Sequence, residues 1–307
     1  MIEYILNMYL QPIIVLIGLA GNLLNFLVFS RKKFEKLATK NIFRTIAVID
    51  TFCLLQIIDK FFQYGFGFYL RKYSNLTCKV FTFLIYSFGP MSAWLLVFIS
   101  IERFISISMP SARIGILFKR KSFQAKIISC IFAYNLIYYT PFLFRVENKC
   151  LLEYNLTNVS IDSKYCCDFV DLESQSILSY LDGFNSSIVP FCLMLLSSLM
   201  NTISIFKSRF RLRNSQQAQK AHKDQNKKRL KRDIQFALTS IYMNVLFIAF
   251  NLPISVIIFF SDHITSLIYV IMVDLYYSSY VINFFIYLAF NSLYRDEFLS
   301  MLRIKKS

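Results

Sequence analysis

The sequence predicts an all-α membrane protein: a bundle of seven transmembrane helices followed by a short amphipathic eighth helix. Three observations predict this fold. The 307 residues are 56% hydrophobic and only 17% charged, whereas about a quarter of the residues of a soluble domain are charged. The apolar residues gather in seven long runs, and the basic residues gather between those runs. We expect one domain, residues 1–307, because no linker or repeat divides the chain.

Each apolar run is long enough to cross the hydrocarbon core of a bilayer, which takes about 20 helical residues. The runs must be helical because lipid offers no partner to free backbone groups. The expected helices cover residues 5–29, 42–66, 77–108, 123–144, 178–206, 232–260 and 264–290. The eighth segment, 291–302, should lie along the membrane surface because one of its faces is apolar at helical spacing, formed by Tyr294, Phe298, Leu299 and Leu302.

Basic residues set the expected orientation. Most of the 34 Lys and Arg residues fall in the first, third and fifth gaps and in the tail, so these segments face the cytoplasm and the N-terminus lies outside. Glycosylation sequons that begin at Asn75, Asn155 and Asn158 fall on the outer side, as the modification requires. A fourth sequon begins at Asn185, where the start of the fifth helix leaves little room for a glycan.

Four cysteines lie on the predicted outer side, where disulfides persist: Cys78, Cys150, Cys166 and Cys167. A bond between the neighbours Cys166 and Cys167 would be strained. We therefore expect Cys78 to pair with either Cys166 or Cys167, and Cys150 to pair with the other. The first bond would tie the outer end of the third helix to the loop before the fifth.

Short motifs occur in order along the predicted helices, each in a separate apolar segment or just after the last one. They are Gly21-Asn22, Ala47-x-x-Asp50, Glu102-Arg103-Phe104, Pro190, Phe247-x-x-x-Asn251-x-Pro253, Asn283-Phe284-x-x-Tyr287 and Tyr294-Arg295-x-x-Phe298. In order and spacing they resemble the motifs of rhodopsin-like (class A) G-protein-coupled receptors. The resemblance covers essentially the whole chain. It implies a multi-pass receptor of the plasma membrane that binds an extracellular ligand and activates a heterotrimeric G protein.

Several positions depart from the family pattern. Asn251 replaces the tryptophan of the sixth helix, Phe284 replaces the proline of the seventh, and Ser198 replaces a tyrosine of the fifth. These departures put the usual activation relay in doubt and indicate a divergent member. In general character the chain is similar to invertebrate neuropeptide receptors of the FMRFamide-like kind.

The resemblance implies two buried polar sites. Asp50 would bind an allosteric sodium ion together with Ser92, Ser279 and Asn283. The second site is the G-protein switch, in which an Arg103–Asp233 pair would hold the third and sixth helices together at rest. The switch residues are Glu102, Arg103, Asp233, Asn283 and Tyr287.

The family positions also imply a ligand pocket lined by Tyr86, Ile254, Ser255, Tyr269, Val273 and Tyr277, with Asp274 and Asp59 nearby to meet a cationic group. Ile85 stands where amine receptors carry an aspartate, and Tyr277 stands where opsins carry the retinal lysine. Residues 142–182 carry more acidic than basic side chains. An acidic mouth attracts a basic ligand, so we expect a basic peptide, such as an amidated neuropeptide.

Other classes of protein fit less well. A chemosensory receptor for a small molecule is the closest alternative, and a seven-helix transporter is a weaker one because no internal repeat or broken segment is evident. The only histidines, His222 and His263, fall in predicted loops, so we expect no enzyme and no cofactor beyond the sodium ion. The net charge of +16 would favour nucleic acid in a soluble protein, but here the membrane accounts for it.

Overall fold

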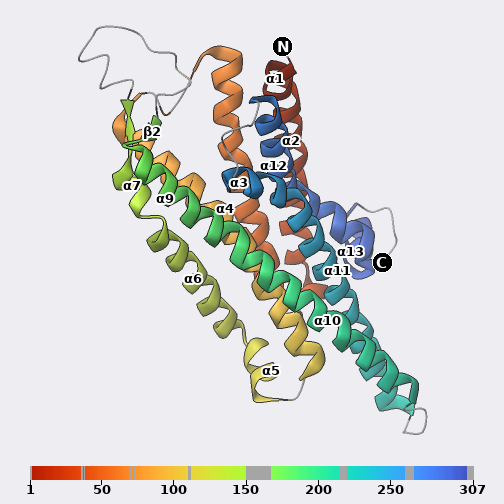
Figure 1. Ribbon diagram of the computed structural model, residues 1–307. Helices are drawn as coiled ribbons and strands as arrows, with labels where there is room; N and C mark the ends of the chain where they lie inside the picture. The colour runs from red at the N-terminus through yellow and green to blue at the C-terminus, as the bar shows by residue number, and fades with distance from the viewer. Residues whose placement is uncertain are drawn as a thin grey trace.

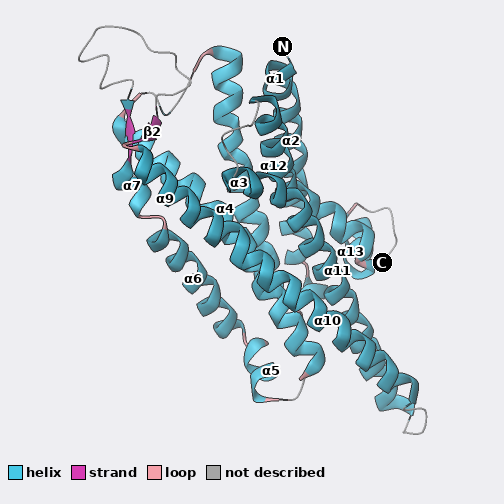
Figure 2. Cartoon of the chain, in the orientation of Figure 1, coloured by secondary structure: helices cyan, strands magenta, loops and turns pink. Residues whose placement is uncertain are grey.

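The computed structural model describes residues 2–35, 37, 39–68, 71, 73–109, 112–149, 167–214, 220–259 and 266–302. Within these ranges it describes no side chains for residues 3, 60, 64, 208–214, 220–233, 257–259 and 266. Figures 1 and 2 show a helical bundle with one small sheet. The elements are α1 (Ile2–Ile5), η1 (Leu6–Leu10), α2 (Gln11–Ser30), η2 (Lys32–Phe34), α3 (Lys40–Phe66), α4 (Asn75–Ser108), α5 (Arg113–Phe118), α6 (Lys121–Tyr138), α7 (Pro141–Arg145), β1 (Val146–Asn148), β2 (Cys167–Phe169), α9 (Leu172–Gly183), η5 (Phe184–Ile188), α10 (Val189–Asn214), α11 (Lys220–Phe259), α12 (Ser266–Phe290) and α13 (Ser292–Met301).

Seven helical stretches of the described chain are long and apolar enough to cross a membrane. They are Leu6–Ser30, Lys40–Gln63, Asn75–Ser108, Lys121–Arg145, Leu172–Lys207, Ile234–Val256 and Leu267–Phe290. The prediction of a seven-helix membrane bundle with a short eighth helix, α13, is therefore confirmed.

The fifth span begins at Leu172, earlier than the predicted residue 178. Its first turn is polar, so hydropathy alone misses it. The start is fixed instead by Asp171, whose carboxylate accepts hydrogen bonds from the Ser174 backbone N–H at 2.6 Å and the Ser174 hydroxyl at 2.9 Å. This cap satisfies a free N–H of the first turn. The same bonds lower the pKa of Asp171 below its usual value.

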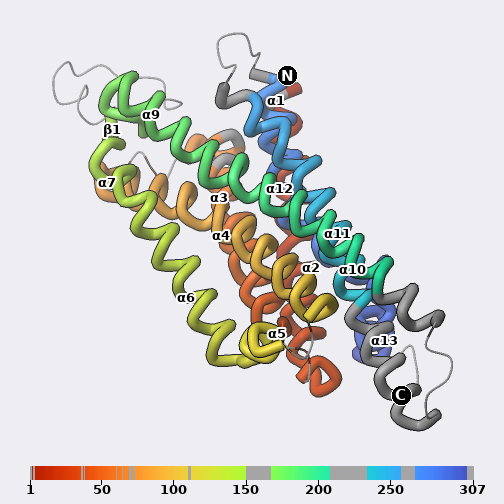
Figure 3. Tube along the Cα trace, turned by 60° about the horizontal axis from the view of Figure 1, so that its bottom comes forward, coloured from red at the N-terminus to blue at the C-terminus, as the bar shows by residue number. Residues whose placement is uncertain are grey.

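Helix α4 runs through the middle of the bundle and contacts α3, α6, α10 and α11. Ser74 caps its start, with the hydroxyl accepting from the Thr77 N–H at 3.0 Å. Close packing against α12 occurs at Gly89, where an added Cβ would collide with the Tyr276 hydroxyl. Helix α6 lies at the edge of the bundle in both views (Figures 1 and 3).

One end of the bundle carries the disulfide, and we call it the disulfide end. The bond joins Cys78 at the start of α4 to Cys167 in β2, which is one of the two partners that the sequence left open. Cys150 and Cys166 lie outside the described residues, so their predicted pairing stays a prediction. Strand β2 pairs antiparallel with β1, and Asn148 stands opposite Cys167. The small sheet is visible at the upper left of Figure 2.

The opposite end, which we call the basic end, carries α13 and the long ends of α10 and α11. Helix α10 continues to Asn214 and α11 begins at Lys220, both well beyond the apolar spans. These extensions, seen at the lower right of Figure 1, show that parts of the fifth gap prolong its two flanking helices.

Candidate ligand and signalling sites

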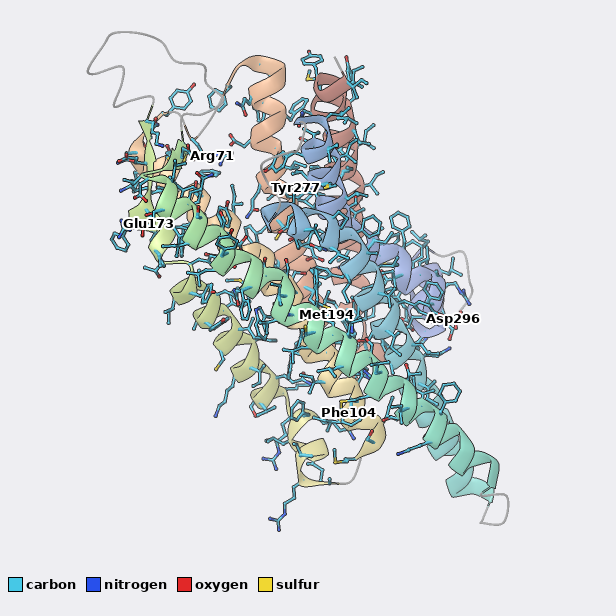
Figure 4. The ribbon with its side chains drawn as sticks, in the orientation of Figure 1. Arg71, Phe104, Glu173, Met194, Tyr277 and Asp296 are labelled. Atoms are coloured by element: carbon cyan, nitrogen blue, oxygen red, sulfur yellow. A yellow bond between two sulfur atoms is a disulfide. The ribbon has the colours of Figure 1, made fainter. Side chains whose placement is uncertain are left out.

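A cavity of about 310 Å³ opens among α3, α4, α9, η5, α11 and α12 near the disulfide end. Arg71 and Tyr277, labelled in the upper half of Figure 4, both line it. The lining includes six of the seven residues predicted for the ligand pocket: Tyr86, Ile254, Ser255, Tyr269, Val273 and Tyr277. The six positions that the family resemblance implied therefore line one cavity.

The seventh predicted pocket residue, Asp274, is not among the described residues that line the cavity. Its Oδ1 accepts a hydrogen bond from Gln11 Nε2 at 2.9 Å, and the residue is 5% exposed. Consecutive residues of an α-helix point about 100° apart. Val273 faces the cavity, so Asp274 turns toward α2 instead. The expectation that Asp274 meets a ligand stays a prediction.

Two charged residues of the cavity wall were missed by the sequence reasoning. Arg71, which follows the second span, pairs with Asp59 at 3.1 Å. Asp182, near the end of α9, lines the cavity and accepts a hydrogen bond from the Tyr139 hydroxyl at 2.7 Å. The sequence analysis counted Asp182 only as part of an acidic loop. A signal was present, since Asp182 falls inside the predicted fifth helix, eight residues before Pro190.

Asn185 holds α4, the end of α6 and η5 together beside this cavity. Its Oδ1 accepts from Trp94 Nε1 at 3.2 Å and from the Tyr134 hydroxyl at 2.9 Å. Its Nδ2 donates to Asn135 Oδ1 at 3.3 Å and to the Tyr139 oxygen at 3.2 Å. The residue is 2% exposed and fully bonded, so no glycan can attach there, in agreement with the doubt raised by its position in the sequence.

Asp50 forms a buried polar cluster in the middle of the bundle. Its Oδ1 accepts from the Ser92 hydroxyl at 2.7 Å, and its Oδ2 accepts from Asn283 Nδ2 at 2.7 Å. The bonds connect α3 to α4 and to α12. Ser279, the other predicted member, donates instead to the Tyr276 carbonyl in its own helix. The structure thus unites three of the four residues predicted for a sodium site through direct bonds.

Arg103 lies near the basic end, and the next residue in the chain, Phe104, is labelled in the lower half of Figure 4. Its Nε pairs with Glu102 at 2.7 Å, and its Nη2 donates to the Thr39 hydroxyl at 2.5 Å. The guanidinium also lies over the Phe236 ring of α11, 5.5 Å from the ring centre. Both charged residues are almost wholly buried. The side chain of Asp233 lies outside the described residues, so the predicted Arg103–Asp233 pair stays a prediction.

The remaining switch residue, Tyr287, is buried among aromatic rings. Its ring meets Phe29 at 5.0 Å and Phe43 at 5.4 Å, both edge-on. Helix α13 packs on the same cluster through Tyr294, whose hydroxyl donates to Asn25 Oδ1 at 2.7 Å. Burial raises the pKa of Tyr294, which keeps this donor protonated.

The predicted amphipathic face of α13 also meets the bundle. The Phe298 ring lies 5.5 Å from the Phe284 ring, while Leu302 is 47% exposed. Glu297, which the sequence analysis did not single out, is buried and pairs with Arg31 at 2.8 Å and with Lys33. Helix α13 is therefore attached to the bundle both by its apolar face and by the ion pairs of Glu297.

Comparison with known proteins agrees with this geometry. The family model described as "7 transmembrane receptor (rhodopsin family)" matches residues 21–287, most of the chain. No curated protein matches the sequence of this chain. Members of this family are receptors, so the expectation of a non-enzymatic membrane protein is confirmed. The chain belongs to the rhodopsin family of seven-transmembrane receptors.

Proposed function

We propose that this receptor lies in the plasma membrane with its N-terminus outside, binds a basic peptide at its disulfide end, and activates a heterotrimeric G protein at its basic end. The observation that carries the proposal is the pair of sites at opposite ends of the bundle. A cavity with a carboxylate in its wall lies at one end. A buried arginine covered by α11 lies at the other.

The contacts of Arg103 suggest how the two ends communicate. At rest, Glu102 and Thr39 hold the guanidinium in place and Phe236 of α11 covers it. An outward movement of α11 would remove Phe236 and open this end to a partner. Asp233 precedes Phe236 by three residues, close to one helical turn, so it lies on the same side of α11. An Arg103–Asp233 pair would add a second restraint on that movement.

The Asp50 cluster fits a sodium ion chemically. Hard cations prefer oxygen ligands, and an ionised carboxylate has about four acceptor positions, of which hydrogen bonds from Ser92 and Asn283 take two. Asp50 and the Ser92 hydroxyl would hold the ion. Ser279 lies about one helical turn before Asn283 in α12. Bound sodium would favour the resting arrangement of α3, α4 and α12, because side chains from these helices would share one ion.

Glycosylation would report the orientation. Asn75 is exposed at the disulfide end, while Asn155 and Asn158 lie outside the described residues. We expect glycans at these three positions and none on the fifth gap. Enzymatic deglycosylation of the wild type and of Asn75→Gln, followed by gel mobility, tests this. If a variant with a sequon introduced between residues 209 and 232 carries a glycan there, the orientation is the opposite of the one proposed.

Signalling itself is tested with a panel of G-protein biosensors in cells that express the chain, challenged with basic amidated peptides. We expect at least one sensor to respond, and Asp233→Ala to raise its basal signal. Silence of every sensor, for well-expressed wild type and Asp233→Ala alike, would refute G-protein coupling.

The cavity volume also favours a second candidate ligand. At about 310 Å³ it lies at the small end of the range for ligand pockets, roughly 300–1,000 Å³. A chemosensory receptor for a small molecule would fill it completely, whereas a peptide would insert only its end. A response to small amines but to no peptide in the same assay would favour the chemosensory function.

A further inference from the structure

Asp182 presents a carboxylate to the cavity in a fixed position. It lies one residue before the end of α9 and lines the cavity wall. The Tyr139 hydroxyl donates to its Oδ1 at 2.7 Å. Among the described residues, no ion pair and no hydrogen bond other than that of Tyr139 reaches this carboxylate. One oxygen is therefore held by the protein and the other is open to an occupant of the cavity.

The charge balance of the described cavity wall favours a cation. Arg71 is the only basic residue of that wall, and it pairs with Asp59 at 3.1 Å. Since Asp59, which lies outside the described lining, already pairs with this guanidinium, the negative charge of Asp182 has no counterpart in the described wall. A charge in a largely enclosed site needs a partner because its interaction with water is reduced.

Tyrosine rings supply the rest of the recognition. Tyr86, Tyr269, Tyr276 and Tyr277 line the same cavity, and the faces of such rings attract ammonium and guanidinium groups. We propose that Asp182 is the counter-ion for an ammonium or guanidinium group of the ligand, which enters this cavity between the carboxylate and the tyrosines. The inference rests on the proposed function in taking the cavity as the ligand site, and it adds the residue and the chemical group.

The Asn185 network explains why Asp182 can act as a fixed anchor. Tyr139, which bonds Asp182, accepts a hydrogen bond from Asn185 Nδ2 at 3.2 Å. Asn185 is in turn bonded to Trp94 of α4 at 3.2 Å. Tyr139 is wholly buried. A cation bound to Asp182 would therefore be connected, through the hydrogen bonds of Tyr139 and Asn185, to α4, the helix that carries Arg103.

The test measures binding of a defined probe to the purified receptor. Both probes are acetylated on the α-amino group, so that arginine amide carries the guanidinium as its only charge and citrulline amide has nearly the same shape with no charge. Ligand-induced thermal stabilisation is recorded for wild type, Asp182→Asn, Asp182→Glu and Glu173→Gln. Glu173→Gln is the matched control, because it removes an exposed carboxylate from the same helix.

We expect arginine amide, and not citrulline amide, to stabilise wild type, Asp182→Glu and Glu173→Gln. Asp182→Asn should weaken this binding about tenfold or more, the typical effect of losing a charged hydrogen bond. Tyr139→Phe should weaken it less while keeping the preference for the charged probe. Equal stabilisation by both probes, no stabilisation by arginine amide, or unchanged binding by Asp182→Asn would each overturn the proposal. If Asp182→Asn does not fold, the comparison of the two probes on wild type and Asp182→Glu still decides it.

The two proposals can fail separately. Asp182-dependent binding of arginine amide by a receptor that leaves every G-protein sensor silent would refute the signalling function and leave the anchor intact. A peptide that activates a sensor equally through wild type and Asp182→Asn would refute the anchor and leave the signalling function intact.

Discussion

Replacing Asn185 with alanine should destabilise the bundle by an amount that the structure allows us to work out. The side chain makes four hydrogen bonds, to Trp94, Tyr134, Asn135 and Tyr139. Polar contacts between helices in membranes are worth on average about 0.6 kcal/mol each, so the four together contribute about 2–3 kcal/mol. For a chain of this size each kcal/mol lowers the melting temperature by roughly 2–4 °C. We therefore expect a fall of about 5–10 °C.

The assay is thermal unfolding of the purified receptor in detergent micelles, followed by the loss of the monodisperse chromatographic peak. Ser186→Ala serves as control, since Ser186 lies in the same turn and its side chain bonds only the neighbouring Ser187 among the described residues, at 3.2 Å. Trp94→Phe removes one of the four bonds and should show about a quarter of the effect. If Asn185→Ala melts together with the Ser186→Ala control, the network does not stabilise the bundle and the reasoning is refuted.

Three further predictions concern the two ends of the bundle. Thr39→Val removes the bond to Arg103 Nη2 and should raise basal signalling in a G-protein biosensor assay; an unchanged basal level would show that this bond does not restrain the switch. Cys167→Ser removes the bond to Cys78 and should lower the melting temperature in line with the typical 2–5 kcal/mol of a native disulfide. If the variant melts at the same temperature as oxidised wild type, the disulfide does not stabilise the bundle. Glu297→Gln weakens two partly exposed ion pairs, with Arg31 and with Lys33, each worth about 1 kcal/mol or less. It should speed amide hydrogen exchange in α13 without changing global unfolding, and unaltered exchange there would show that the pairs do not hold the helix.

The fold was largely predictable because the bilayer limits what an apolar run can do. A run of about 20 apolar residues has to become a helix, so hydropathy locates the spans well. It fails where a polar turn continues the helix beyond the lipid, as at Leu172, where the cap is Asp171. The extent of α11, which begins at Lys220, likewise depends on helix formation in water, where hydropathy gives no signal.

The candidate site was predictable only where the family register applies. Tyr86 and Tyr277 line the cavity because equivalent positions on equivalent helices point inward. Asp274 lies outside the described lining and bonds Gln11, because one step along a helix changes the face, and the sequence alone does not show which face meets which neighbour. Arg71 and Asp182 were missed for a related reason. Arg71 lies beyond the end of α3 and Asp182 lies near the end of α9, so the place of each in the cavity depends on how these segments pack in the folded bundle.

The departures from the family pattern gain a physical meaning in the folded bundle. Asn251, in place of a tryptophan, donates to the Phe247 carbonyl of its own helix at 2.7 Å, and this bond does not link α11 to its neighbours. The link is made about two turns away by Asn244, whose Nδ2 donates to the Ser100 hydroxyl of α4 at 2.7 Å and to the Ser198 hydroxyl of α10 at 2.9 Å. Ser198 stands where the family carries a tyrosine, so the substitution supplies an acceptor for Asn244.

The position of these bonds bears on how α11 moves. Asn244 is buried, and it lies between the cavity residue Ser255 and Phe236, which covers Arg103. An outward swing of α11 must stretch both bonds of Asn244 before Phe236 can leave the arginine. Since an unmade buried hydrogen bond costs about 1–3 kcal/mol, such a swing is opposed unless new partners form. Under the proposed function, the hydrogen bonds of Asn244 to α4 and α10 therefore restrain the movement of α11 that would uncover Arg103.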